Sequence, residues 1–139
     1  MSLLPDLSRF ELQVLKQLWT LKEANARDLQ AALDSESSYS TVRKILERLE
    51  GKGAVERVRV EHKAWIYRPT ISQPQMVQKE VRRFLDSMFD GVAGPLMTHL
   101  ADMNAVTMED LQEAERILDE EDAGRAADKP NREQEGGNV

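Results

Sequence analysis

The segment from Ser38 to Pro69 constrains the fold more strongly than any other part of the chain, because it contains a helix, a helix stop and two extended runs in succession. Ser38 is a residue type that caps helix N-termini, and apolar residues then recur every three or four positions, as on the buried face of a helix. These apolar residues are Val42, Ile45, Leu46 and Leu49. Gly51 and Gly53 end the predicted helix.

A β-hairpin is predicted immediately after this helix. Residues 55–60 and 65–67 are rich in β-branched and aromatic side chains, and Pro69 ends the second run. The intervening residues 61–63 are Glu, His and Lys. They include no glycine, the residue that two-residue hairpin turns prefer because their central residues need positive φ angles. We therefore expect a longer or irregular tip rather than a two-residue turn.

Two capped helices are predicted before this segment. Ser8 and Glu11 have the spacing of a capping box, and the helix that they open has one apolar face, which we expect to pack in a core. This face consists of Phe10, Val14, Leu15, Leu18 and Trp19. Asn25 and Asp28 repeat the capping pattern for a shorter helix that ends near Leu33.

Three further helices are predicted after Pro69. Their starts are marked by Ser72 with Gln75, by Gly94–Pro95 and by Thr107 with Asp110. From about residue 121 onward almost no large apolar side chain remains, so we expect a disordered tail.

These elements predict a mainly α fold with a small β-wing. We assign residues 1–70 to a winged helix-turn-helix domain, residues 71–120 to a three-helix dimerisation region and residues 121–139 to the disordered tail. The total of 139 residues is enough for one domain or for a small domain with an attached helical element.

Positive charge is concentrated in the helix and hairpin. Eight Lys or Arg lie between Arg43 and Arg68 against four acids, a local charge of +4 in a chain whose net charge is −6. Such a basic stretch is typical of a surface that contacts nucleic-acid phosphates. On the helix alone, Arg43, Lys44 and Arg48 could equally be ordinary solvated residues balanced by acids, and it is the basic hairpin that favours DNA binding.

Hydroxyl groups and cations on the first turns of a helix are suited to reading base edges in the major groove. We predict base contacts from Ser40, Thr41, Arg43 and Lys44. We predict phosphate contacts from Ser38, Tyr39, Arg48, Lys52, Arg57, Arg59 and Lys63.

Over most of its length the chain resembles the penicillinase and methicillin-resistance repressors, the BlaI/MecI family. The resemblance is carried by Leu7-Ser8-x-x-Glu11, by Ser38-x-x-Thr41-Val42-x-x-Ile45-Leu46-x-Arg48-Leu49-x-x-Lys52-Gly53 and by Trp65-x-Tyr67-x-Pro69. It implies a homodimeric repressor with a winged helix on each subunit, a palindromic DNA operator and base readers at Ser40, Thr41 and Lys44.

The same resemblance implies two features of regulation. A membrane-bound sensor protease is a possible partner, and the pair that matches the family's cleaved Asn-Phe bond is His99–Leu100. The cysteine cluster of copper-responsive relatives is absent, because the chain contains no cysteine.

Apolar residues after Pro69 predict a dimer independently, because so short a helical region cannot bury all of them alone. The predicted dimerisation residues are Val77, Val81, Phe84, Leu85, Met88, Phe89, Leu96, Met97, Leu100, Leu111 and Leu118. The alternative is that these helices fold back on the winged helix as one monomeric core.

Other classes of function have weaker support. No Gly-rich phosphate loop, HExxH motif or Ser/His/Asp arrangement is present, so we predict neither an enzyme nor a cofactor. His62 and His99 lie in different halves without neighbouring ligands, so we predict no metal site. No apolar run is long enough to span a membrane and no secretory signal precedes Ser8, so we expect a cytoplasmic protein.

The principal rival to DNA binding is a winged helix that serves as a protein-interaction module without specific DNA binding. In that case Tyr39, Trp65 and Tyr67 would form an apolar docking surface.

Overall fold

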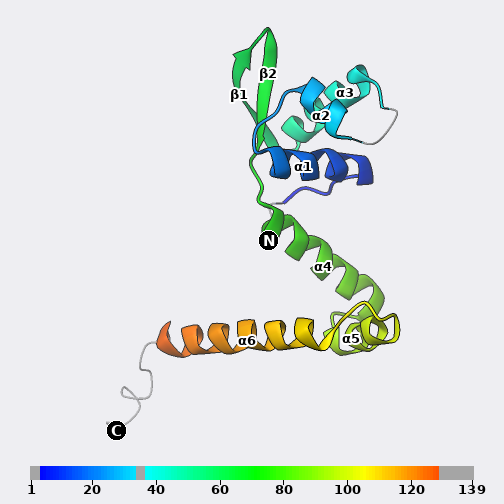
Figure 1. Cartoon of the computed structure of the whole chain (residues 1–139), viewed down its shortest axis with the longest axis vertical. Coiled ribbons are helices and arrows are strands. Elements are labelled where there is room, and N and C mark those ends of the chain that lie inside the picture. The colour runs from blue at the N-terminus through cyan, green and yellow to red at the C-terminus, as the bar shows by residue number, and fades with distance from the viewer. Residues whose placement is uncertain (1–3, 34–36, 129–139) are drawn as a thin grey trace. The chain divides into compact units, whose positions relative to one another are not determined.

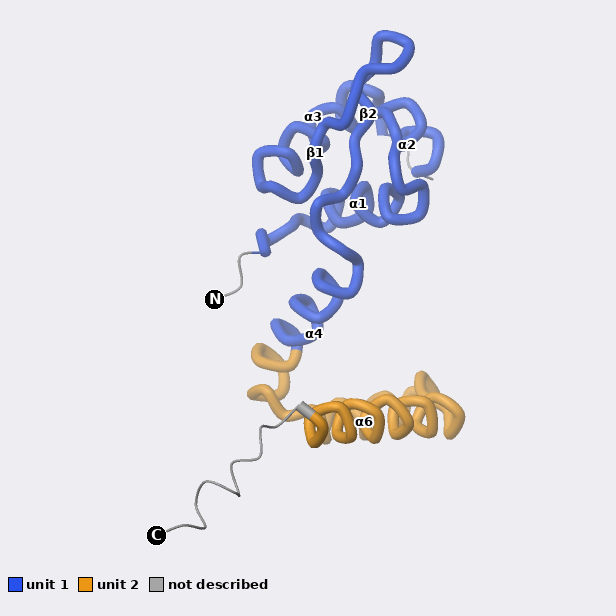
Figure 2. Tube along the Cα trace, turned by 90° about the vertical axis from the view of Figure 1, so that its left-hand side faces the viewer, with its two compact units in different colours: residues 1–84 blue, residues 85–139 orange. Residues whose placement is uncertain are grey.

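The computed structural model describes residues 4–33 and 37–128, which form six helices and one two-stranded sheet (Figure 1). The elements are α1 (Arg9–Leu21), α2 (Ala26–Ala32), α3 (Tyr39–Gly51), β1 (Val55–Glu61), β2 (Ala64–Pro69), α4 (Gln73–Phe89), α5 (Ala93–Asp102) and α6 (Met108–Asp128). The chain divides into two compact units, one ending at Phe84 and one beginning at Leu85, so the boundary lies within α4 (Figure 2). The mainly α fold with a small β-wing is confirmed. Within the described residues, no helix is both long enough and apolar enough to cross a membrane.

Side-chain caps begin the helices where the sequence predicts them. The Ser8 hydroxyl accepts a hydrogen bond from the Glu11 backbone N–H at 3.2 Å, and the Glu11 carboxylate accepts one from the Ser8 N–H at 3.0 Å. Asn25 and Asp28 form the same reciprocal box, and the Ser38 hydroxyl accepts from the backbone N–H of Thr41. The pairs Ser72 with Gln75 and Thr107 with Asp110 open α4 and α6 in the same way. Each cap satisfies backbone donors that have no partner inside the helix.

The core of the first unit lies where α1, α2, α3 and the sheet meet. Its fully buried side chains include Val14, Leu15, Leu18, Leu29, Val42, Leu46 and Leu49. Trp19 is half-buried against this core and donates a hydrogen bond from Nε1 to the carbonyl oxygen of Ile71 at 2.8 Å. Ala24 and Tyr67 exchange two backbone hydrogen bonds, which join the α1–α2 connection to β2. The base of the hairpin is therefore fixed to the helices.

One buried carboxylate links the start of α1 to the end of α3. Glu11 is 2% exposed, and its Oε1 accepts a hydrogen bond from the Lys52 ammonium at 2.8 Å. Burial raises the pKa of Glu11, but hydrogen bonds from Lys52 and Ser8 outweigh burial, so the pKa lies below its usual value. Lys52 also donates to the carbonyl oxygen of Asp6. The Lys52 ammonium thus joins the end of α3 to Asp6 and Glu11, which lie more than 40 residues earlier in the sequence.

The hairpin turn differs from the sequence prediction. Glu61 pairs with Ala64, so the turn consists of His62 and Lys63 alone, with φ angles of 49° and 65°. Positive φ at both central residues is the geometry of a type I′ turn, and the expectation of a longer or irregular tip was wrong. This turn type matches the right-handed twist of a two-stranded ribbon, and His is one of the non-glycine residues more often found at positive φ. The irregularity lies instead in β1, where the pairing register shifts between Arg57 and Arg59.

The second unit contains the end of α4 with α5 and α6. Leu85 is 8% exposed, and the Phe89 and His99 rings lie 5.8 Å apart between centroids. Helix α6 continues to Asp128, further than the predicted start of the tail at residue 121. Its exposed surface is rich in charged residues spaced four apart, such as Arg116 with Glu120, which support a helix without burial. The rest of the predicted tail, residues 129–139, lies outside the described residues.

Replacement of Lys52 by methionine should destabilise the first unit. The Oε2 atom of Glu11 is already buried without a hydrogen-bond partner among the described residues, and Lys52→Met would remove the cation that Oε1 requires. Because Lys52 is partly exposed, we expect a loss of about 2–4 kcal/mol in the free energy of unfolding, measured by urea denaturation. Lys44→Met, at an exposed position of α3, is the matched control and should stay within about 0.5 kcal/mol of the wild type.

Replacement of Lys63 by glycine should stabilise the hairpin. Glycine adopts a φ near 65° without the steric penalty that lysine incurs, so Lys63→Gly should raise the free energy of unfolding by about 0.5–1 kcal/mol. Lys63→Ala removes the same charge but keeps a Cβ atom, and should give no such gain. A destabilised Lys63→Gly variant in urea denaturation would contradict the type I′ turn.

Candidate nucleic-acid interface

The first turn of α3 presents three hydroxyl groups that are bonded to one another. The Ser38 hydroxyl lies 3.0 Å from that of Ser40 and 2.8 Å from that of Thr41, and all three residues are exposed. The burial of Val42, Ile45, Leu46 and Leu49 orients the opposite face of α3 to solvent. A helix start of this kind carries donors and acceptors on a surface that another molecule can reach.

The predicted base-contacting residues do not all lie on one face of α3. Ser40 and Lys44 are four residues apart and both exposed, so they share the outward face. Arg43 shares a face instead with Tyr39 and Glu47, which lie one turn before and one turn after it. The guanidinium of Arg43 is 5.9 Å from the centroid of the Tyr39 ring. The structure therefore directs Arg43 toward the wing and leaves Ser40 and Lys44 as the outward pair.

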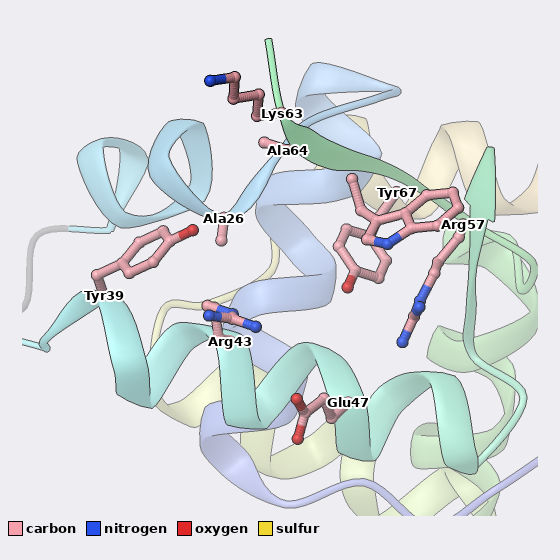
Figure 3. A pocket seen from close by; sticks show the side chains of 9 residues that line it. Ala26, Tyr39, Arg43, Glu47, Arg57, Lys63, Ala64 and Tyr67 are labelled. Atoms are coloured by element: carbon pink, nitrogen blue, oxygen red, sulfur yellow. The ribbon is translucent and has the colours of Figure 1, made fainter. Parts of the chain in front are cut away.

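A cavity of about 240 Å³ lies between α3 and the wing (Figure 3). Its lining combines aromatic rings with cations and one acid: Ala26, Tyr39, Arg43, Glu47, Arg57, Lys63, Ala64, Trp65 and Tyr67. The Arg57 guanidinium is 5.2 Å from the centroid of the Trp65 ring. Burial raises the pKa of Tyr67, so its hydroxyl remains protonated at neutral pH. The cavity thus offers hydrogen-bond donors beside ring faces.

Most arginines of the wing are paired with acids of the same unit. Arg57 Nε lies 2.9 Å from a Glu50 carboxylate oxygen, and Arg68 pairs with Glu56 across the two strands. Arg59 contacts both Glu23, at 2.7 Å, and Glu61, at 2.5 Å. The positive charge that the sequence assigned to the wing is therefore largely balanced within the protein.

Of the remaining predicted phosphate contacts, Lys52 and Tyr39 bind other residues of the protein, whereas Arg48 and Lys63 are exposed. Lys52 forms its ion pair with Glu11 at the end of α3, so its position favours a structural role. Tyr39 is half-buried and stacks with Arg27 at 5.4 Å. Arg48 and Lys63 are exposed, and neither forms an ion pair with an acid in residues 4–33 or 37–128. Lys63 occupies the turn of the wing.

The predicted dimerisation residues differ in exposure. Those exposed are Val77, Val81, Phe84, Met88, Met97, Leu111 and Leu118. Leu85 is buried, whereas Phe89, Leu96 and Leu100 are half-buried. His99 and Leu100 both lie inside α5, with His99 exposed.

The residues that line the cavity but were absent from the predicted DNA-contact sets are Ala26, Glu47, Ala64, Trp65 and Tyr67. Glu47 lines the cavity, and its spacing of eight residues from Tyr39 could have indicated a shared helix face. Trp65 also lines the cavity and is 43% exposed. As a contact residue, Trp65 was predicted only for the rival docking surface, together with Tyr39 and Tyr67, and not for DNA.

Comparison with known proteins gives one family match over most of the chain. A family model described as penicillinase repressor matches residues 7–120. The penicillinase repressor of Bacillus licheniformis is 25% identical over 122 residues, which cover 86% of this chain and 94% of that protein.

Two solved structures are similar in part. The solution structure of the DNA binding domain of the repressor BlaI is 30% identical, with a TM-score of 0.47, and covers 54% of this chain and 93% of that one. A crystal structure of a MarR mutant from E. coli complexed with operator DNA is 16% identical, with a TM-score of 0.46, and covers 83% of this chain and 75% of that one.

Proposed function

Because this chain belongs to the penicillinase repressor family, we propose that it is a DNA-binding transcriptional repressor that acts as a homodimer. The observation that carries the proposal is the exposed first turn of α3, with its bonded hydroxyls and Lys44, beside a cavity that the wing lines on one side. In a winged helix this arrangement suits a recognition helix in the major groove with a hairpin on the adjacent backbone.

We assign base reading to the outward face of α3. Lys44 can donate to guanine O6 and N7, and the hydroxyls of Ser40 and Thr41 can act as donor or acceptor toward any base. Ser38 caps the helix and orients both hydroxyls, so its contribution is positioning. Arg43, turned toward the wing, is assigned to a phosphate rather than to a base.

The electrostatic part of binding should be smaller than the sequence suggests. Of the eight cations between Arg43 and Arg68, four pair with acids: Lys52, Arg57, Arg59 and Arg68. The other four, Arg43, Lys44, Arg48 and Lys63, form no ion pair among the described residues. Arg43, Arg48 and Lys63 are available to phosphates, and Lys44 is assigned to a base. Each available cation releases about one counterion on binding.

The homodimer is supported by the apolar surface of α4. Val77, Val81 and Phe84 are 48%, 48% and 47% exposed, and Met88 is 65% exposed. Their spacings of four, three and four residues place them in one stripe along the helix. A second subunit would remove this stripe from water, and two copies of α3 could then read two half-sites about 34–36 Å apart on a palindromic operator.

Relief of repression by cleavage belongs to the same proposal. The His99–Leu100 bond lies in the regular helix α5, so a sensor protease would have to unwind α5 locally before cutting. Cleavage there would separate α6 from the rest of the chain and weaken the dimer.

The docking surface predicted for the rival function, a protein-interaction module, is mostly not exposed in the structure. Tyr67 is 8% exposed and Tyr39 is half-buried, so of the three aromatic residues only Trp65 presents a large exposed face. One such side chain is too little for a stable protein interface.

The salt dependence of DNA binding should report the three cations of each subunit that are available to phosphates. A bound homodimer then makes six phosphate contacts, so the slope of log affinity against log salt concentration should be about −5.4, against about −11 if the three wing arginines of each subunit also bind phosphates. Fluorescence anisotropy on a sequence selected from random DNA, and on its scrambled version, would measure this slope. A slope near −11 would show that the wing arginines leave their acids on binding.

Single substitutions separate the two roles within that experiment. Lys44→Ala should reduce the preference for the selected over the scrambled sequence by about 1–3 kcal/mol. Lys63→Ala should weaken both sequences equally and make the slope shallower by about two, one for each subunit. Arg9→Ala is the control, because this exposed arginine begins α1, outside the lining of the cavity, and should change neither quantity. Equal effects of Lys44→Ala and Lys63→Ala on preference would contradict these roles.

A charge placed in the α4 stripe should prevent dimerisation. Val81→Glu would bury an unpaired carboxylate, and we expect the dimer dissociation constant to rise on the order of 100-fold in sedimentation equilibrium. Arg82→Gln changes the net charge by the same single unit at an exposed position about 100° around the helix from Val81, and should leave the dimer intact. A Val81→Glu protein that remains dimeric would assign the interface to other helices.

A further inference from the structure

The wing exposes an apolar pair that the core does not use. Val60 and Trp65 face each other across the two strands and are 54% and 43% exposed. The other tryptophan of the chain, Trp19, is half-buried and hydrogen-bonded to Ile71. An exposed large aromatic side chain in a small protein is a feature to be explained by binding.

Trp65 is held in place from one side. The Arg57 guanidinium stacks over its ring at 5.2 Å, and Arg57 is in turn fixed by Glu50 at 2.9 Å. The chain Glu50–Arg57–Trp65 therefore runs from the last turn of α3 to the wing. It orders the indole without burying it, so little side-chain entropy remains to be lost when a ligand binds.

The surroundings of Trp65 are cationic as well as aromatic. Among the residues that line the cavity, Arg43, Arg57 and Lys63 are basic and Glu47 alone is acidic, and Arg43 lies one helical turn from Tyr39 across the cavity from the wing (Figure 3). A DNA strand alternates an anionic phosphate with a largely apolar deoxyribose. A cavity with a cation on one wall and an indole on the other is complementary to one such repeat.

We propose that the cavity between α3 and the wing takes one sugar–phosphate unit of the DNA backbone, with the phosphate on Arg43 and the deoxyribose against Trp65, whose cross-strand partner Val60 extends the apolar surface outside the cavity. The inference rests on the proposed DNA binding and adds a contact that is apolar and independent of salt. Arg57 is a positioning residue for the indole. Such an apolar contact would let the wing bind DNA while its arginines are paired with acids.

The emission of Trp65 itself tests this contact. In a Trp19→Phe protein the only tryptophan is Trp65, and titration with duplex DNA at low salt should shift and quench its emission in step with the anisotropy of the labelled DNA. The side chain under test is unchanged, so the result does not depend on whether a Trp65 variant folds. DNA binding with unaltered Trp65 emission would overturn the proposal.

Substitution distinguishes an apolar contact from an ionic one. Trp65→Ala should weaken binding to selected and scrambled DNA alike by about tenfold and leave the salt slope unchanged, whereas Lys63→Ala changes the slope. Val60→Ala should give a smaller loss in the same direction. A Trp65→Ala protein that binds DNA as tightly as the wild type overturns the proposal, and one that loses self-association instead would assign the pair to a second copy of the chain. Absence of DNA binding by the wild-type protein would overturn the proposed function itself, a result distinct from both.

Discussion

The ion pair between Glu11 and Lys52 holds together the parts of the first unit on which the rest depends. The Glu11 carboxylate caps α1 through Ser8 and binds the ammonium at the end of α3. Lys52 also bonds to the carbonyl oxygen of Asp6, whose carboxylate accepts hydrogen bonds from Lys79 and Arg83 of α4. The hydrogen bond from Lys79 lowers the pKa of Asp6, so this link stays charged at neutral pH. One ionic network therefore contacts both α3, which we propose reads DNA, and α4, which carries the proposed dimer stripe.

Local signals in the sequence predicted the helices well because each depends on few residues. A cap needs an oxygen at one position and an N–H two or three residues later, and the boxes at Ser8, Asn25 and Thr107 all form as predicted. Local signals did not predict the hairpin turn, because a type I′ turn without glycine is stabilised by the strands on either side rather than by its own residues. The type of the turn depends on the twist of the two-stranded ribbon, which the sequence of the turn does not encode.

The candidate site was harder to predict than the fold, because charge neutralisation is a tertiary property. Arg59 and Glu23 are far apart in sequence and lie 2.7 Å apart in the structure. The pairing of Arg68 with Glu56 depends on strand register. A count of cations along the sequence therefore predicted a strongly basic wing, whereas the structure leaves Lys63 unpaired at its turn, near the apolar pair of Val60 and Trp65. Lys52 is a second example. The sequence predicted that it binds a phosphate, but in the structure it forms an ion pair with the buried carboxylate of Glu11.

A wing with neutralised arginines is consistent with the overall acidity of the chain. With a net charge of −6, long-range attraction to DNA is weak, so non-specific binding gains little from the field of the protein as a whole. In the proposed complex, affinity comes from groups in contact: hydroxyls and Lys44 on α3, a few unpaired cations, and the apolar face of Trp65. The contacts of the hydroxyls and Lys44 with base edges are lost when the surface meets a wrong sequence, whereas those with phosphate and deoxyribose are kept. A repressor built in this way gains selectivity by limiting the attraction that all DNA sequences share.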